Sequence, residues 1–110
     1  MSTNNFEKGV KFSFNNSISY ADNAVVSKQI LKKETGNITL FAFDKGEGIS
    51  EHSTPFDAVV HIVDGKAAII INGKSNIVEA NETIIMPANI PHALKAVEKF
   101  KMVLTMIKQK

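Results

Sequence analysis

The sequence predicts a single domain of the all-β class, a sandwich or barrel of short antiparallel strands. Apolar runs of strand length, rich in Val, Ile and Phe, recur along the chain. Asp-Gly and Asn-Gly dipeptides, which supply the positive φ angles of tight hairpin turns, separate three of these runs. A chain of 110 residues with 44% hydrophobic residues is long enough to bury one core without disulfides. We therefore expect roughly eight or more strands and no substantial helix.

The first part of the chain predicts an arm followed by a hairpin. Residues 1–10 are polar and Asn-rich, which is typical of a frayed arm or an edge strand. Residues 25–33 have some helix propensity, but they lead through a Thr35-Gly36-Asn37 turn into the β run of residues 38–43. We therefore expect two strands joined by a hairpin, in a domain that spans residues 11–110.

The second part predicts a three-stranded meander and two further strands. Two-residue turns at Asp64-Gly65 and Asn72-Gly73 are expected to join the meander. A proline-bounded loop, residues 87–91, is expected to separate the remaining two strands. The five expected strands are residues 58–63, 67–71, 75–79, 83–86 and 100–107.

Two of these strands are apolar at consecutive positions rather than at alternate ones. Residues 67–71 read Ala-Ala-Ile-Ile-Ile, and residues 84–86 read Ile-Ile-Met. Successive side chains on a strand point to opposite faces, so both faces of these strands should be dry. A homodimer, formed by strand exchange or sheet packing, would cover the second face. The alternative is that a second sheet of the same chain covers it.

Composition excludes several classes of function. The chain has no Cys, which rules out disulfides, thiolate nucleophiles and Cys-ligated metal centres. Its 13 basic residues are all Lys and give a net charge of only +2, so we expect no nucleic-acid partner. The polar N-terminus and the short apolar runs predict no membrane segment and a cytoplasmic protein.

Two segments carry the residues on which function depends. The first, residues 46–65, contains Gly46, His52 and Gly65, and the second, residues 81–92, ends in Met-Pro-Ala-Asn-Ile-Pro-His. Together they resemble the two signature motifs of the cupin superfamily, with Pro87 and His92 also at motif positions. The resemblance covers roughly residues 36–107 and implies a small antiparallel jelly-roll barrel.

The chain departs from this motif at the residues that bind metal in the family. The resemblance implies a site of three His and one Glu, but Thr54 stands at the second His position and Ala58 at the Glu position. Both glycines of the second motif are replaced, by Asn81 and Asn89, and its terminal Asn is Ala96. The Gly to Asn changes are mild because Asn tolerates a left-handed backbone well.

His52 and His92 are therefore the candidate metal ligands. On a strand, the side chains of residues 52 and 54 point into the same cavity, and His92 follows the proline loop at the start of a neighbouring strand. Two imidazoles can bind a divalent ion (Zn, Fe, Mn or Ni), but such sites usually use three or more protein ligands. The alternative for both residues is a polar role in a vestigial pocket.

Two other side chains are candidates to complete the site. Asp57 and His61 lie in the same strand as Ala58, and regular alternation from Ala58 would point both of them outward. A bulge near Pro55 would reverse this for Asp57. Aromatic and Met side chains are expected in the core, although they also line the mouths of barrels: Phe41, Phe43, Phe56, Met86, Met102 and Met106.

Three functions remain open at this level. In the first, the barrel mouth holds a divalent metal and a small oxygenated or cyclic molecule, on which the metal acts as a Lewis acid. In the second, the protein is a metal-free module that binds a small ligand, and in the third it is an assembly domain. The sequence leaves open whether the protein is an enzyme, because one fold hosts many functions.

Overall fold

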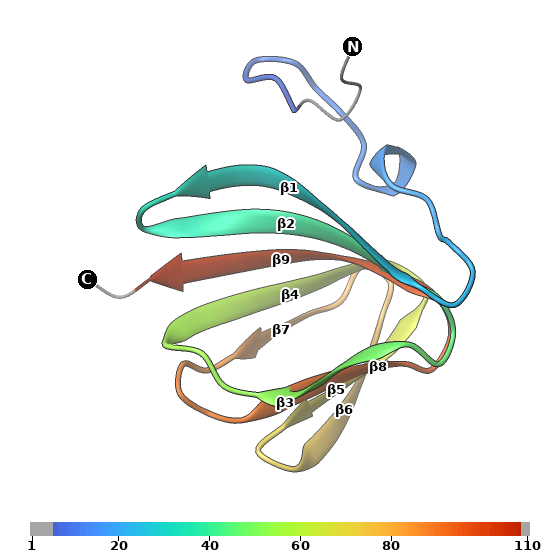
Figure 1. Ribbon diagram of the computed structural model, residues 1–110, viewed down its shortest axis with the longest axis vertical. Helices are drawn as coiled ribbons and strands as arrows, with labels where there is room; N and C mark the ends of the chain where they lie inside the picture. The colour runs from blue at the N-terminus through green and yellow to red at the C-terminus, as the bar shows by residue number, and fades with distance from the viewer. Residues whose placement is uncertain (1–5, 109–110) are drawn as a thin grey trace.

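Two antiparallel sheets packed face to face make up the domain (Figure 1). The structure is a computed structural model and describes residues 6–108. One sheet has five strands in the order β1 (Val25–Lys33), β2 (Gly36–Phe43), β9 (Phe100–Lys108), β4 (Phe56–Asp64) and β7 (Thr83–Met86). The other has four, in the order β3 (Gly48–His52), β8 (His92–Ala96), β5 (Lys66–Ile71) and β6 (Lys74–Glu79). The predicted all-β jelly roll is confirmed.

Two of the three expected hairpins are present. Strands β1 and β2 pair antiparallel with Lys33 opposite Gly36, so the turn lies at residues 34–35, slightly earlier than expected. Strands β5 and β6 pair with Ile71 opposite Lys74. Between them Asn72 and Gly73 have φ angles of 52° and 80°, which is the left-handed backbone that a two-residue hairpin turn requires.

The expected hairpin at Asp64-Gly65 is wrong. Strand β4 pairs with β7 and β9, whereas β5 belongs to the other sheet, so this dipeptide takes the chain from one sheet to the other. Gly65 has a φ of +85°, and a Cβ at this position would overlap the carbonyl oxygen of Lys99. The dipeptide signals a sharp reversal of the chain, but it does not determine whether the strands on either side pair.

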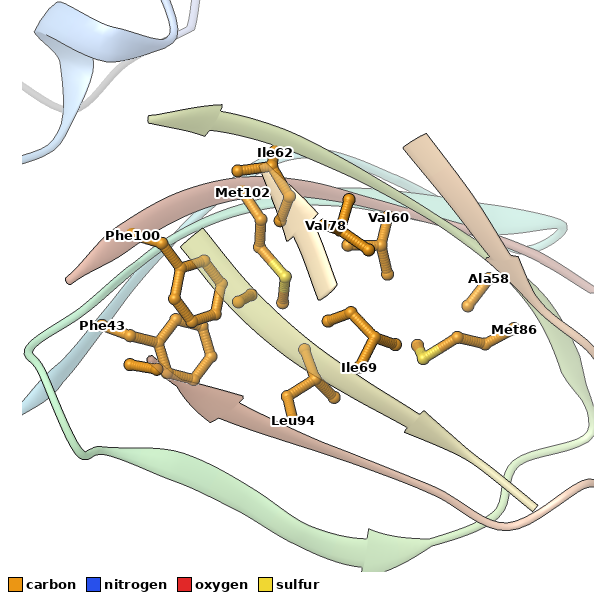
Figure 2. Close-up of a cluster of buried hydrophobic side chains, with 12 residues drawn as sticks. Phe43, Ala58, Val60, Ile62, Ile69, Val78, Met86, Leu94, Phe100 and Met102 are labelled. Carbon is orange, nitrogen blue, oxygen red and sulfur yellow. The ribbon is translucent and has the colours of Figure 1, made fainter. Parts of the chain in front are cut away.

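The main hydrophobic core fills the space between the two sheets (Figure 2). Strand β4 contributes Ala58, Val60 and Ile62 from alternate positions, each at most 1% exposed. Phe43 and Phe100 stack with ring centroids 4.4 Å apart and fill one end of this core. Ala58 and Met86 lie at the opposite end of the cluster.

The chain that precedes β1 packs on the outer face of the five-stranded sheet. Ile18 is buried there with Leu40, Ala42 and Val103, in a second apolar cluster. Residues 6–24 contain no strand and one short 3₁₀ helix, η1 (Asn15–Ser17). Of the expected arm, residues 1–5 lie outside the described residues, and residues 6–10 form a turn rather than an edge strand.

Lysine and tyrosine side chains fasten this N-terminal segment to the sheet. The Lys101 ammonium is buried and donates to the Asn15 backbone oxygen at 2.6 Å, and Lys28 donates to the oxygen of Ser17 at 2.8 Å. The Tyr20 hydroxyl donates to Asp64 at 2.6 Å.

No helix among residues 6–108 has the length and apolarity needed to cross a membrane.

Part of the outer face of the five-stranded sheet stays uncovered. Ile85 is 60% exposed and lies opposite Val59, which in turn lies opposite Thr105. Thr105 on β9 pairs with Ile38 on the adjacent strand β2, so an uncharged row crosses four strands. On the other sheet, Ile77 is 54% exposed. The second sheet of the same chain therefore does not cover Ile85, and the homodimer remains a prediction.

We expect two copies to pair through this uncharged row. Ile85→Lys should leave the fold intact, because Ile85 is largely exposed, and should convert a dimer into a monomer, because a charge would be buried at the interface. Ile77→Lys is the matched control and should remain dimeric. Sedimentation velocity at micromolar concentration measures both variants. A wild-type monomer would contradict the prediction.

Candidate functional site

A cavity of about 190 Å³ lies between the two sheets. Three of its lining side chains are polar, namely His52, Thr54 and His92. The other eight are apolar: Phe41, Ile49, Ala58, Met86, Leu94, Met102, Leu104 and Met106. The cavity therefore combines an apolar interior with a single cluster of polar groups.

The pairing of β3 with β8 brings the two candidate histidines together. His52 ends β3 and lies directly opposite His92, the first residue of β8. Their ring centroids are 4.5 Å apart and the rings meet edge to face at 68°. His52 is exposed, whereas His92 is only 4% exposed. The expectation that these imidazoles share one cavity is confirmed.

The proline-bounded loop is held against the chain that follows β3. Asn89 has a φ of 66° and donates its backbone N–H to the Thr54 oxygen at 2.7 Å. The Asp57 carboxylate accepts the N–H of Ala88 at 2.9 Å. Asn81 also has a positive φ, 72°, so asparagine at both sites adopts the left-handed backbone expected from the sequence. These contacts fix where His92 enters β8.

Each imidazole is oriented by the carbonyl oxygen two residues before it. His52 Nδ1 lies 2.8 Å from the Ser50 oxygen, and His92 Nδ1 lies 3.2 Å from the Ile90 oxygen. A carbonyl oxygen only accepts, so Nδ1 carries the proton in both rings. In the neutral ring, Nε2 then keeps its lone pair. The pair can therefore accept two hydrogen bonds or bind a metal ion.

Burial lowers the pKa of His92 below its ordinary value of 6.5. Desolvation of the charged ring is the largest cause, the Ile90 carbonyl opposes it, and the nearby His52 lowers the pKa further. His92 is therefore neutral at pH 7, with Nε2 available as an acceptor.

The two positions where the motif lacks a ligand also face the cavity. Thr54 is half-buried, and its hydroxyl lies 3.4 Å from the backbone oxygen of Phe56. Ala58 is 1% exposed and has no donor atom in its side chain. All four ligand positions of the motif thus line the cavity, and two of them carry no expected ligand.

Neither candidate replacement ligand lines the cavity. Asp57 is exposed and binds the Ala88 N–H, and His61 lies on the outer face of β4 with Nδ1 2.8 Å from the Thr83 hydroxyl. The expected outward direction of both side chains is confirmed. Among residues 6–108, no group of three or more His, Cys, Asp and Glu residues is placed to hold a metal ion.

Several lining residues were not recognised as such in the sequence. Leu94 follows His92 by two residues and Leu104 precedes Met106 by two, so alternation could have placed both inward. Ile49 lies three residues before His52, and both reach the cavity only because the pairing of β3 is irregular between them, which alternation does not predict. Phe41 and the methionines were expected in the core or at a barrel mouth, and Phe41, Met86, Met102 and Met106 do line the cavity. Phe43 instead stacks on Phe100.

Comparison with known proteins identifies the family. Residues 39–108 match the cupin domain family, and the chain belongs to the cupin superfamily. A conserved protein of unknown function from Streptococcus pyogenes is 38% identical, with a TM-score of 0.91, over 100% of this chain and 97% of the other. A search of curated proteins found no match.

Two further solved structures are similar. A cupin 2 conserved barrel domain protein from Leptotrichia buccalis is 37% identical with a TM-score of 0.86, over 88% of this chain and 47% of that protein. A cupin superfamily protein from Desulfitobacterium hafniense is 24% identical with a TM-score of 0.89, over 96% of both chains, and supports the fold alone.

The donors around the cavity fit the four-ligand metal site of the family only in part. Two imidazoles have free Nε2 atoms, but the lining contains no carboxylate. Divalent zinc or iron usually requires at least three protein ligands. The full family site is therefore not reproduced by these residues.

We expect acid to destabilise the fold through His92. The pKa of His92 is lower in the folded protein than in the unfolded chain. As the pH falls through 6.5, the unfolded chain therefore binds a proton before the folded protein does, and the free energy of unfolding decreases. Urea denaturation at several pH values should show this decline, and His92→Gln should reduce it. In an NMR titration, a His92 midpoint at or above 6.5 would contradict the assignment.

Proposed function

We propose that this cupin binds a small, mainly apolar molecule in the cavity, with one polar group of the ligand against His52, Thr54 and His92. The observation that carries the proposal is the composition of the lining, in which eight apolar side chains accompany a single polar cluster. Ligand pockets commonly have this arrangement, because apolar walls supply affinity and a few polar groups fix orientation.

The size of the cavity limits the ligand to about one ring. An apolar cavity of about 150 Å³ binds benzene, and the cavity here has about 190 Å³. A monocyclic molecule therefore matches the available volume, whereas drug-sized ligands usually occupy about 300 Å³ or more.

The protonation of the histidines defines the polar group that suits the site. Both Nδ1 atoms donate to backbone oxygens, so both Nε2 atoms are acceptors when the rings are neutral. A ligand with a hydrogen-bond donor, such as a hydroxyl, complements this pair. An isosteric ligand with a methyl group in its place leaves the acceptors without a partner.

Phenol and toluene test this proposal as a matched pair of probes. At pH 7.5 we expect phenol to bind more tightly by roughly threefold to tenfold, the value of one net hydrogen bond. The double variant His52→Ala, His92→Ala should remove the preference, whereas His61→Ala should preserve it. Chemical-shift titration by NMR measures both affinities.

A cavity-filling variant separates binding in the cavity from binding elsewhere. Ala58→Leu extends into the cavity and should abolish binding of both probes. Ala68→Leu adds the same volume on the outer face of β5, next to the buried Ala67 and Ile69, and should leave binding unchanged. Equal affinities of phenol and toluene in the wild type, or binding that survives Ala58→Leu, would overturn the proposal.

A second candidate function is binding of a divalent ion (Zn, Fe, Mn or Ni) through His52 and His92. The support for it is the Nδ1 to carbonyl contact of both rings, since metal-binding histidines usually have such a partner on the other nitrogen. A bound ion would supply Lewis-acid chemistry. Two protein ligands predict weak binding, completed by water or ligand oxygens.

Elemental analysis of untagged protein tests this second candidate. After incubation with each salt and desalting, we expect substoichiometric metal that disappears in His52→Ala and His92→Ala and persists in His61→Ala. Absence of metal from the wild-type protein would leave the protein as a metal-free module that binds a small molecule.

The cytoplasmic location expected from the sequence remains a prediction.

A further inference from the structure

The methionines of the chain gather at the candidate site. The sequence contains four methionines, and the three that follow Met1 all line the cavity. Met86 and Met106 both pair with Ala58, one on each side, so these three residues form one row across β7, β4 and β9. All three also line the cavity, so the thioethers of Met86 and Met106 lie on either side of Ala58, which has no donor atom in its side chain.

The histidine pair lies toward the same end of the barrel as this row. Phe43 and Phe100 fill the opposite end of the core, away from Ala58 and Met86 (Figure 2). On β9, Met106 follows Phe100 by six residues, about 20 Å at 3.3 Å per residue. Ala96 ends β8, and its backbone oxygen accepts the N–H of Gly46, which follows Phe43 by three residues. His92 begins β8 and therefore lies at the end of this strand away from Phe43.

Met102 differs from the other two methionines in its position along the barrel rather than in its depth, since Met86 is also buried, at 2% exposed. Met102 follows Phe100 by only two residues on β9, it pairs with Ile62 and Phe41, and it is fully buried. Met106 is half-buried, as expected for a residue nearer the mouth. The thioethers of Met86 and Met106 are therefore the sulfur donors best placed to act together with the imidazoles.

The donor atoms of this cavity are thioether sulfurs and imidazole nitrogens, which favour soft metal ions over hard ones. Thioether and imidazole ligands suit Cu(I), whereas Mg, Ca and Mn prefer carboxylate, carbonyl and water oxygens. The lining contains neither carboxylate nor thiolate. We propose that the cavity binds one monovalent copper ion through Nε2 of His52 and His92 and the Sδ atoms of Met86 and Met106.

This proposal deepens the metal-binding candidate above and rests on the same histidine pair. It differs in the ion and in the sulfur ligands, so the two can fail separately. It also accounts for a chain that retains two imidazoles while lacking a carboxylate at position 58, since a monovalent soft ion needs neither a third histidine nor an anionic oxygen.

Competition with a chromophoric Cu(I) chelator under anaerobic conditions tests the proposal. The wild-type protein should withdraw one equivalent of Cu(I) from bicinchoninate. The double variant Met86→Leu, Met106→Leu, which conserves volume, should bind Cu(I) at least about tenfold more weakly. Met102→Leu is the matched control and should bind as the wild type does. X-ray absorption should show a Cu–S shell in the wild type and none in the Met86→Leu, Met106→Leu variant.

The outcomes distinguish this proposal from the divalent one. Zn(II) and Ni(II) affinities should be unchanged in the double Leu variant, because those ions would use only the imidazoles. Failure to withdraw Cu(I), or equal Cu(I) affinity in the wild type and the double variant, would overturn the copper proposal while leaving divalent binding to its own test. Thermal unfolding of each apo variant checks that the Leu substitutions preserve the fold.

Discussion

The site depends on the register between β3 and β8. Antiparallel pairing places His52 opposite His92, with the imidazole rings in edge-to-face contact. A shift of one residue would turn one of the two side chains to the other face of the sheet, because side chains alternate along a strand. The register is supported from outside the strands, where Asn89 donates to Thr54 and Asp57 accepts from Ala88. Asp57 therefore contributes to the site by holding the loop rather than by contacting a ligand.

The same two sheets give the barrel two unlike ends. The stacked rings of Phe43 and Phe100 fill one end. Ala58 lies at the other end of the cluster. It lines the cavity together with His52 and His92. Dense packing at one end can offset the cost of leaving a cavity at the other, since unfilled apolar volume destabilises a core. A short chain thus combines a densely packed end of the core with a cavity that is a candidate site.

Local patterns in the sequence predicted most of the strands, and the glycine positions of the motif predicted the left-handed backbone at Asn81 and Asn89. They succeeded because strand alternation and turn chemistry are local properties. The Asp64-Gly65 corner was misassigned because its backbone conformation is local, whereas the pairing of β4 with β9 depends on residues about forty positions away. The packing of Ile18 on Leu40 was missed for the same reason.

The candidate site was only partly accessible from sequence. His52 and His92 were found because motif spacing carries them, and the outward direction of His61 followed from alternation. The orientation of each ring was not predictable, because it depends on the carbonyl oxygens of Ser50 and Ile90 in the folded backbone. The grouping of Met86 with Met106 around Ala58 required the order of β7, β4 and β9 in the sheet.

The binding chemistry proposed for the cavity depends on an unprotonated Nε2 in both imidazoles, which the contacts of the two Nδ1 atoms with carbonyl oxygens imply. Long-range ¹⁵N–¹H correlation NMR of the histidine rings at pH 7.5 measures the protonation state of each nitrogen directly. We predict the Nδ1–H tautomer for His52 and for His92, with Nε2 shifts typical of an unprotonated nitrogen. An Nε2–H tautomer in either ring would contradict the account, because that nitrogen could neither accept a hydrogen bond from a ligand nor bind a metal ion.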